Sequence, residues 1–183
     1  MLRRAFASVL VGAALALPVT AISAAPAAAA PALQATTLTY DDSQAGEFKS
    51  QVAAGVNVWN TSVTNVHIVK ATSGQRVNIK VIAFDGWPQT QLGPVRPNGT
   101  VTVWMGRQAV QQGYNVVRIA AHELGHALGL LDNKPGPCSS LMSGSTGGVS
   151  CQNTKPNAAE AARVQQNYAG TLVGTGAIVA DAA

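Results

Sequence analysis

Apolar residues alternate with polar ones from Val77 to Val81, and this period of two predicts a β-strand over residues 77–84. Similar short runs, rich in β-branched and aromatic residues, predict further strands at residues 37–40, 66–69 and 101–104. Glycine and proline recur between Gly86 and Gly99, so we expect an irregular segment there.

Three other segments follow the period of a helix. Residues 46–60 carry an apolar stripe at helical spacing, formed by Phe48, Val52, Val56 and Trp59. Residues 115–128 predict a second helix with Asn115 as its N-cap, and the pattern at residues 157–160 resembles a capping box that opens a third. Strands early in the chain and helices later predict an α+β domain with a small mixed sheet.

The start of the chain has the pattern of a secretory signal peptide. Arg3 and Arg4 form a positive region, an apolar run follows from Val9 to Leu17, and small residues extend from Ala24 to Ala32. The apolar run is too short to span a membrane. We therefore expect residues 1–30 to direct secretion to the outside of the cell.

The remaining chain predicts one domain over residues 36–169, with a short propeptide at 31–35 and a small apolar tail at 170–183. We expect the tail to be a loose terminus and assign it no function. Removing the leader lowers the basic residues from 12 to 10 against 8 acidic ones, so the net charge falls to +2. Because no basic cluster remains, nucleic acid and membranes are not expected as partners, and we expect a monomer.

The most informative segment reads HELGHALGLLD and begins at His122. His122 and His126 lie one helical turn apart, so their imidazoles converge as zinc ligands do. Glu123 is next to the first histidine and is the candidate general base. Gly129 allows a sharp turn of the chain, after which Asp132 can return to the metal as a third ligand.

An amphipathic core helix is the alternative for this segment, with two histidines that bind each other or the backbone. That alternative gives no reason for the spacing of Glu123, Gly129 and Asp132. It also leaves unexplained the distant segment Leu141-Met142-Ser143-Gly144. We therefore favour a zinc site.

The motif HExxHxxGxxD, followed by a turn that carries a methionine, resembles the metzincin layout. Aspartate as the last residue of the motif, in a short secreted chain, resembles the snapalysin family of small neutral metalloproteases of Gram-positive bacteria. The resemblance covers roughly residues 36–168. Its most specific stretches are Ala121–Asp132, Gly136–Ser139, Leu141–Gly144 and Cys151.

This resemblance implies a metzincin-like fold with an active-site helix, and a secreted zinc endopeptidase acting on proteins or peptides. His122, His126 and Asp132 would hold the zinc, Glu123 would be the catalytic base, and Met142 would form an apolar floor beneath the metal. The family prefers an aromatic residue just after the scissile bond. We expect the walls of that pocket to come from residues 143–149 and the zinc helix.

Two positions depart from the family. Family members carry tyrosine two residues after the zinc aspartate, where this chain has Lys134. We expect Lys134 to be solvated, as most loop lysines are. The alternative is that its ammonium group stabilises the oxyanion.

Family members also bind calcium through an aspartate where Asn115 aligns. Asn115 lacks the charge that calcium prefers and Val117 lacks a hydroxyl group, which argues against calcium here.

Cys138 and Cys151 are the two cysteines of the chain. In an exported protein a disulfide between them is the natural interpretation, because their spacing matches no zinc motif. The bridge would span Met142 and stiffen the loop that carries it.

Two other functions stay open. One is a secreted zinc-binding module with little or no turnover, and the other is a zinc amidase that acts on cell-wall peptides. Glu123 favours turnover, because a structural zinc site has a closed shell and needs no carboxylate beside it.

His67 is expected in a strand without binding metal, and Trp59, Trp87 and Trp104 are expected in the core.

Overall fold

The computed structural model describes residues 34–169 and 178–180. The elements, in chain order, are β1 (Thr36–Gln44), the 3-10 helix η1 (Gly46–Phe48), α1 (Lys49–Ser62), β2 (Val66–Lys70), β3 (Ile79–Phe84), β4 (Gln89–Gln91), β5 (Val101–Gly106), α2 (Arg107–Gln111), α3 (Val116–Ala127), the 3-10 helix η2 (Leu141–Gly147), α4 (Ala158–Asn167) and β6 (Ile178–Ala180). The predicted α+β class is confirmed. The sequence missed α2 and the strand β4 inside the expected irregular segment.

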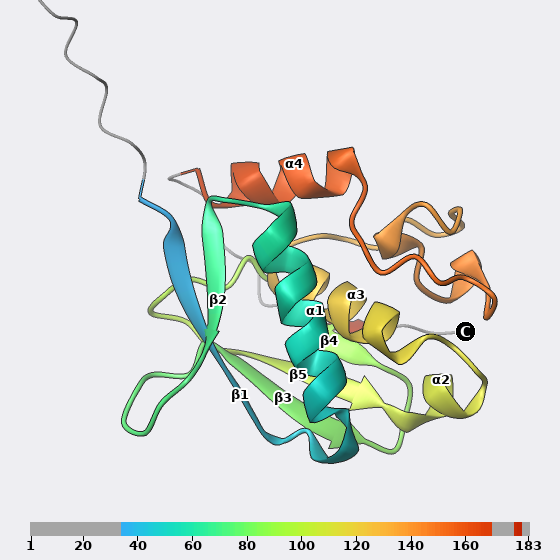
Figure 1. The fold of residues 1–183 in the computed structure, drawn as a ribbon, viewed down its shortest axis with the longest axis horizontal. Coiled ribbons are helices and arrows are strands. Elements are labelled where there is room, and N and C mark those ends of the chain that lie inside the picture. Colours follow the sequence, from blue (N-terminus) through green and yellow to red (C-terminus); the bar gives the residue numbers. More distant parts are fainter. Residues whose placement is uncertain (1–33, 170–177, 181–183) are drawn as a thin grey trace, which may run out of the picture. The chain divides into compact units, whose positions relative to one another are not determined.

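The six strands form one mixed sheet in the order β2-β1-β3-β5-β4-β6. Strands β2, β1, β3 and β5 are parallel, whereas β4 pairs antiparallel with β5 and with β6. Thr90 of β4 lies opposite Val103 of β5, which fixes the register of β4. The antiparallel strands therefore lie at one side of the sheet, next to β5 (Figure 1).

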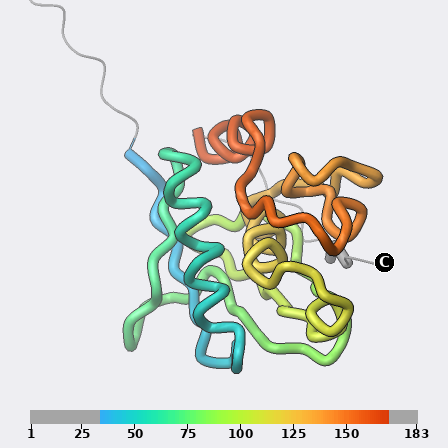
Figure 2. The backbone as a smooth tube through the Cα atoms, turned by 45° about the vertical axis from the view of Figure 1, so that its right-hand side comes forward, coloured from blue at the N-terminus to red at the C-terminus, as the bar shows by residue number. Residues whose placement is uncertain are grey.

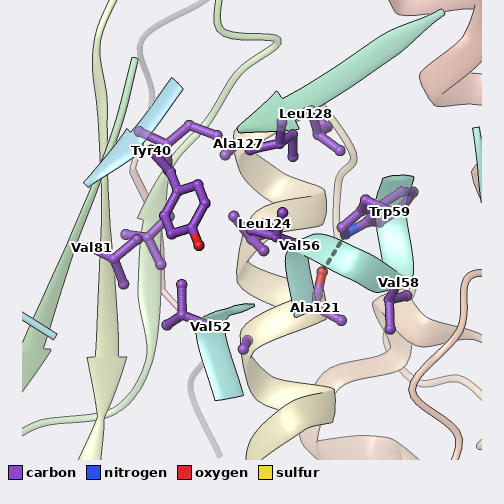
Figure 3. Packing of buried hydrophobic residues seen from close by; sticks show 14 of the residues in the cluster. Tyr40, Val52, Val56, Val58, Trp59, Val81, Ala121, Leu124, Ala127 and Leu128 are labelled. Atoms are coloured by element: carbon purple, nitrogen blue, oxygen red, sulfur yellow. Dashed lines mark hydrogen bonds between the residues drawn. The ribbon is translucent and has the colours of Figure 1, made fainter. Parts of the chain in front are cut away.

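One face of the sheet is covered by helices α1 and α3 (Figure 1). The strands explain this arrangement, because every second side chain is buried: in β5 these are Val101, Val103 and Met105. Figure 3 shows the layer between, where Leu124 of α3 and Val56 of α1 lie beside Tyr40 and Val81 of the sheet. The active-site helix is thus a central part of the core.

Helices α1 and α3 approach each other closely at Gly55. A Cβ atom at that position would lie only 3.0 Å from the backbone nitrogen of Ala121. One turn further on, the Trp59 indole N–H donates a hydrogen bond of 2.8 Å to the carbonyl oxygen of Ala121 (Figure 3). These contacts fix the position of α3 directly before its first histidine.

Both predicted helix caps are present. The side chain of Asn115 accepts a hydrogen bond of 3.0 Å from the backbone N–H of Arg118. At the start of α4, Asn157 accepts from the N–H of Glu160, and the Glu160 carboxylate accepts from the N–H of Asn157. Figure 2 shows the segment between α3 and α4 running beside α3 before the chain enters α4.

The predicted signal peptide, residues 1–30, lies outside the described residues, as do residues 31–33 of the predicted propeptide. Among the described residues no helix is long and apolar enough to cross a membrane. The expectation of a loose C-terminal tail is wrong for residues 178–180. They pair with β4 as the strand β6.

Candidate metal centre

Helix α3 places His122 and His126 one turn apart on its buried face. Both side chains are almost fully inaccessible, with 2% and 0% of their surface exposed. The helix ends at Ala127, and Gly129 turns the chain with a φ of 92°, a backbone conformation that glycine adopts readily. The turn brings Asp132 back toward the two imidazoles.

Three ligand atoms converge at this point. The two imidazole Nε2 atoms lie 3.0 Å apart, and each lies 3.3 Å from Oδ1 of Asp132. Ligands placed tetrahedrally at about 2.0–2.1 Å from zinc lie about 3.3–3.4 Å from one another. The two distances to Asp132 match three corners of a tetrahedral zinc shell, and the two imidazoles lie slightly closer together than in that shell.

The protonation of the two histidines follows from their other ring nitrogens. Nδ1 of His122 lies 2.9 Å from the carbonyl oxygen of Leu141, and Nδ1 of His126 lies 2.7 Å from that of Leu130. A carbonyl oxygen only accepts, so each Nδ1 carries the proton and each Nε2 presents a lone pair. Oδ1 of Asp132 is buried and has no hydrogen-bond donor among the described residues. Three electron pairs that face one another in this way fit a bound cation.

The Asp132 carboxylate stays charged in this setting. Burial raises its pKa, but while no metal is bound, hydrogen bonds and positive charge from the His122 and His126 imidazoles in their protonated form outweigh burial and hold the pKa well below its ordinary value. The anion is the form that binds a metal ion.

Glu123 is completely buried next to the three ligands. Its Oε2 atom accepts a hydrogen bond of 2.6 Å from the Thr90 hydroxyl group on β4, whereas Oε1 has no partner among the described residues. Burial raises the pKa of Glu123, while the nearby imidazoles and the Thr90 hydrogen bond act in the opposite direction. A carboxyl group with one oxygen free and a raised pKa is suited to general base work.

Lys134 is not solvated as expected. Its side chain is 20% exposed, and its ammonium nitrogen lies 3.5 Å from Oδ2 of Asp132. The two oxygens of Asp132 thus have separate contacts, one with the imidazoles and one with a cation. The expectation failed because Gly129 turns the chain back toward the histidines, and Lys134 follows Asp132 by only two residues.

Met142 lies under the metal-ligand helix. A Cβ atom at Gly125, between the two histidines, would lie 2.7 Å from the Met142 sulfur atom. The methionine is 1% exposed, and its carbonyl oxygen accepts a hydrogen bond of 2.7 Å from the N–H of Asn133. The turn therefore contacts both the helix and the segment that carries Asp132.

The methionine turn is held by two buried charged side chains that the sequence did not single out for this role. Glu160 of α4 accepts hydrogen bonds from the N–H groups of Leu141 and Met142, at 3.1 and 2.9 Å. Arg118 of α3 donates to the carbonyl oxygen of Ser140 at 2.8 Å. Because Leu141 in turn holds His122, Glu160 is connected to the first metal ligand through one residue.

The predicted disulfide between Cys138 and Cys151 is confirmed. It encloses the methionine turn, since Met142 lies between the two cysteines. The loop that carries the turn is closed by a covalent bond as well as by hydrogen bonds.

A hollow with a mostly apolar lining lies beside His122. Its walls come from α2, the segment that leads into α3, the start of α3, the methionine turn and the segment before β4: Trp87, Ala109, Tyr114, Asn115, Arg118, Ile119, Gly144 and Ser145. Trp87 packs against the core, as expected, and it also lines this hollow. Trp59 is buried as expected. His67 is exposed on β2, which lies at the opposite edge of the sheet from β4 and β6.

Asn115 uses both side-chain groups within the protein. Besides capping α3, its amide nitrogen donates a hydrogen bond of 2.6 Å to the Gln152 side chain. That the chain does not bind calcium here stays a prediction.

Thr90 is the site residue that the sequence did not indicate at all. It lies in a segment rich in glycine and proline, with no apolar period to predict a strand. Its contact with Glu123 joins residues 33 positions apart, so spacing in the chain gives no signal for it.

Comparison with known proteins gives a consistent picture. Residues 35–171 match the model of the Streptomyces extracellular neutral proteinase (M7) family. The extracellular small neutral protease of Streptomyces coelicolor is 38% identical over 146 residues, which are 79% of this chain and 65% of that protein. The protein of the same name from Streptomyces caespitosus is 37% identical over 133 residues, which are 73% of this chain and 97% of that protein.

This chain thus spans 65% of the length of the Streptomyces coelicolor protein. It spans 57% and 60% of two further Streptomyces relatives of the same name. Among solved structures, a hatching-enzyme zinc protease from the medaka fish Oryzias latipes overlaps 54% of this chain and 46% of its own, with a TM-score of 0.40 and 22% identity.

Proposed function

This chain belongs to the extracellular neutral proteinase (M7) family, and on that premise we propose that it is a secreted zinc-dependent endopeptidase. Four of its relatives are named extracellular small neutral proteases. In this proposal residues 1–30 are the secretion leader, 31–35 a short propeptide and 36–169 the catalytic domain. The observation that carries it is the meeting of three lone pairs next to a buried carboxylate with one free oxygen.

His122, His126 and Asp132 would hold the zinc ion. The donor set fits, because two neutral imidazoles and one carboxylate oxygen are ligands that zinc prefers, and their mutual distances match a tetrahedral shell. Zinc bound there supplies a Lewis acid that lowers the pKa of a water molecule and polarises a carbonyl group. Three protein ligands leave the fourth position open, as a catalytic site requires.

Glu123 acts as the general base. Its Oε1 atom takes a proton from the attacking water molecule and then passes that proton to the leaving amine. Burial of the carboxyl group raises its pKa, which suits a group that must both accept and release a proton. A structural zinc site has no use for this residue, so Glu123 supports an enzyme over a zinc-binding module.

The hollow beside His122 is the proposed pocket for the substrate residue after the scissile bond. Its lining includes the rings of Trp87 and Tyr114, whose centroids lie 6.0 Å apart, and the small residue Gly144. An apolar lining with two aromatic rings suits contact with an aromatic side chain of the substrate. We infer a preference for an aromatic residue at that position.

The test is hydrolysis of casein by the full chain from a secreting host, compared with its Glu123→Ala variant. We expect the variant to lose at least about a hundredfold in kcat/KM, because general base catalysis contributes about that much or more. Zinc content measured on both proteins is the control, since Glu123 is not a ligand in this proposal.

Cleavage by the wild-type chain, loss in the variant and equal zinc in both would support the proposal. Zinc in both proteins with no cleavage of casein by either would contradict it. Activity on peptidoglycan fragments in place of casein would instead favour an amidase.

A further inference from the structure

We propose that Thr90 of β4 is a positioning residue that holds the Glu123 carboxylate ready for catalysis. The inference rests on the proposed function, because it assigns a role toward the general base of that reaction. It adds a contribution of the sheet to a site whose other residues come from α3 and the segments that follow it.

The contact is short and closed to solvent. The Thr90 hydroxyl donates to Oε2 of Glu123 at 2.6 Å, and both residues have 0% of their surface exposed. A hydroxyl group has one proton to donate, so this hydrogen bond uses it fully. Hydrogen bonds to an ionised acceptor are shorter and stronger than neutral ones.

The hydrogen bond divides the two oxygens of the carboxylate. Oε2 is occupied by Thr90, and Oε1 is the oxygen without a hydrogen-bond partner among the described residues. A carboxylate held at one oxygen has its side-chain rotation restricted, and the other oxygen keeps its lone pairs for the water molecule. Restricting a reacting group in this way lowers the entropy lost on reaching the transition state.

Thr90 is itself fixed by the sheet. It pairs with Val103 of β5 on one side and with Val179 of β6 on the other. Paired residues of an antiparallel ladder point to the same face, and Val103 is buried on the face that α3 covers. The hydroxyl group therefore reaches Glu123 from a rigid element, whereas a residue on a free loop would hold it less firmly.

The experiment compares Thr90→Val, which keeps the shape and removes the hydroxyl, with Thr90→Ser, which keeps the hydroxyl. Thr102→Val is the matched control, because Thr102 lies on β5 with its side chain on the opposite face from Val103. Peptide hydrolysis gives kcat and KM separately, and thermal unfolding checks that each variant is folded.

We expect Thr90→Val to lower kcat about ten- to a hundredfold with KM unchanged, since a misplaced catalytic group costs rate more than binding. Thr90→Ser should keep kcat within about threefold of the wild type, and Thr102→Val should have no effect on it. If Thr90→Val, folded like the wild type, turns over at the wild-type rate, the inference is wrong. Absence of cleavage by the wild type would instead refute the proposed function.

A second readout does not depend on activity. In metal-free protein, Thr90→Val is made in the wild type and in the Glu123→Ala background, and unfolding by urea is measured for all four chains. A hydrogen bond between the two residues predicts that Thr90→Val destabilises the wild type more than the Glu123→Ala chain. Equal effects in both backgrounds would overturn the proposal.

Discussion

Single side chains at this site divide their polar atoms between two tasks. Asp132 directs Oδ1 to the imidazoles and Oδ2 to Lys134, and Glu123 directs Oε2 to Thr90 while Oε1 stays free. Each histidine donates from Nδ1 to a backbone carbonyl oxygen and keeps Nε2 for the metal. The chemistry thus depends on individual atoms, so we expect a substitution that removes one of these atoms to change it.

Tyr168 gives a test of stability at the same scale. Its hydroxyl donates a hydrogen bond of 2.9 Å to the Val95 carbonyl oxygen, and burial raises its pKa above the ordinary value. Above about pH 10 the unfolded chain loses this proton while the folded chain keeps it, so the free energy of unfolding falls. Below about pH 10 the stabilisation is fully present.

We therefore expect the free energy of unfolding to fall less steeply with pH in Tyr168→Phe than in the wild type, by up to about 1.4 kcal/mol per pH unit. Urea unfolding between about pH 9 and about pH 11 measures the two slopes. The lost hydrogen bond shifts the stability of the variant equally at all pH values, so only the slope is diagnostic. Parallel slopes would refute the assignment.

At the level of elements, the segment between α3 and α4 is held from several sides. Arg118 of α3 binds its carbonyl oxygens, Glu160 of α4 binds its N–H groups, and the disulfide closes it. The short strand β4 has a comparable role on the other side of the site, because it carries Thr90. Elements without metal ligands, α4 and β4, therefore contribute to the geometry of the site.

Glu160→Gln tests this interpretation. The carboxylate accepts from the Ser140 hydroxyl and from the N–H groups of Leu141, Met142 and Asn157. An amide nitrogen cannot accept, so two of these buried donors lose their partner. We expect a loss of about 2–4 kcal/mol in the free energy of unfolding, measured with urea.

Glu47→Gln is the matched control, since Glu47 binds Arg107 at the surface and its side chain is 52% exposed. Exposed ion pairs contribute little, so this variant should unfold close to the wild type. A similar loss in both variants would mean that Glu160 has no special role in holding the methionine turn.

At the scale of the whole molecule, the sequence could predict that the three metal ligands lie together, because they are close to one another in the chain. His122 and His126 are one helical turn apart, and Gly129 turns the chain so that Asp132 returns within a few residues. The α+β class and the long helices also follow from local periods. Helix α2, with five residues, is too short to show one.

Contacts between distant segments could not be predicted in this way. Thr90 meets Glu123 only because β4 pairs with β5 and α3 packs on the sheet, and no local pattern encodes either fact. Glu160 was recognised as part of a capping box, but its hydrogen bonds to the methionine turn depend on where α4 docks. The contact of Lys134 with Asp132 likewise could not be predicted without the path of the chain.

Metal dependence tests the central claim most directly. The chain is stripped with a chelator, zinc is added back in steps, and casein hydrolysis is measured at each step. The account predicts no hydrolysis without metal and a rise that saturates at about one zinc ion per chain, because three ligands meet at one centre. Full hydrolysis by the stripped protein, or a folded protein that takes up zinc without regaining hydrolysis, would contradict it.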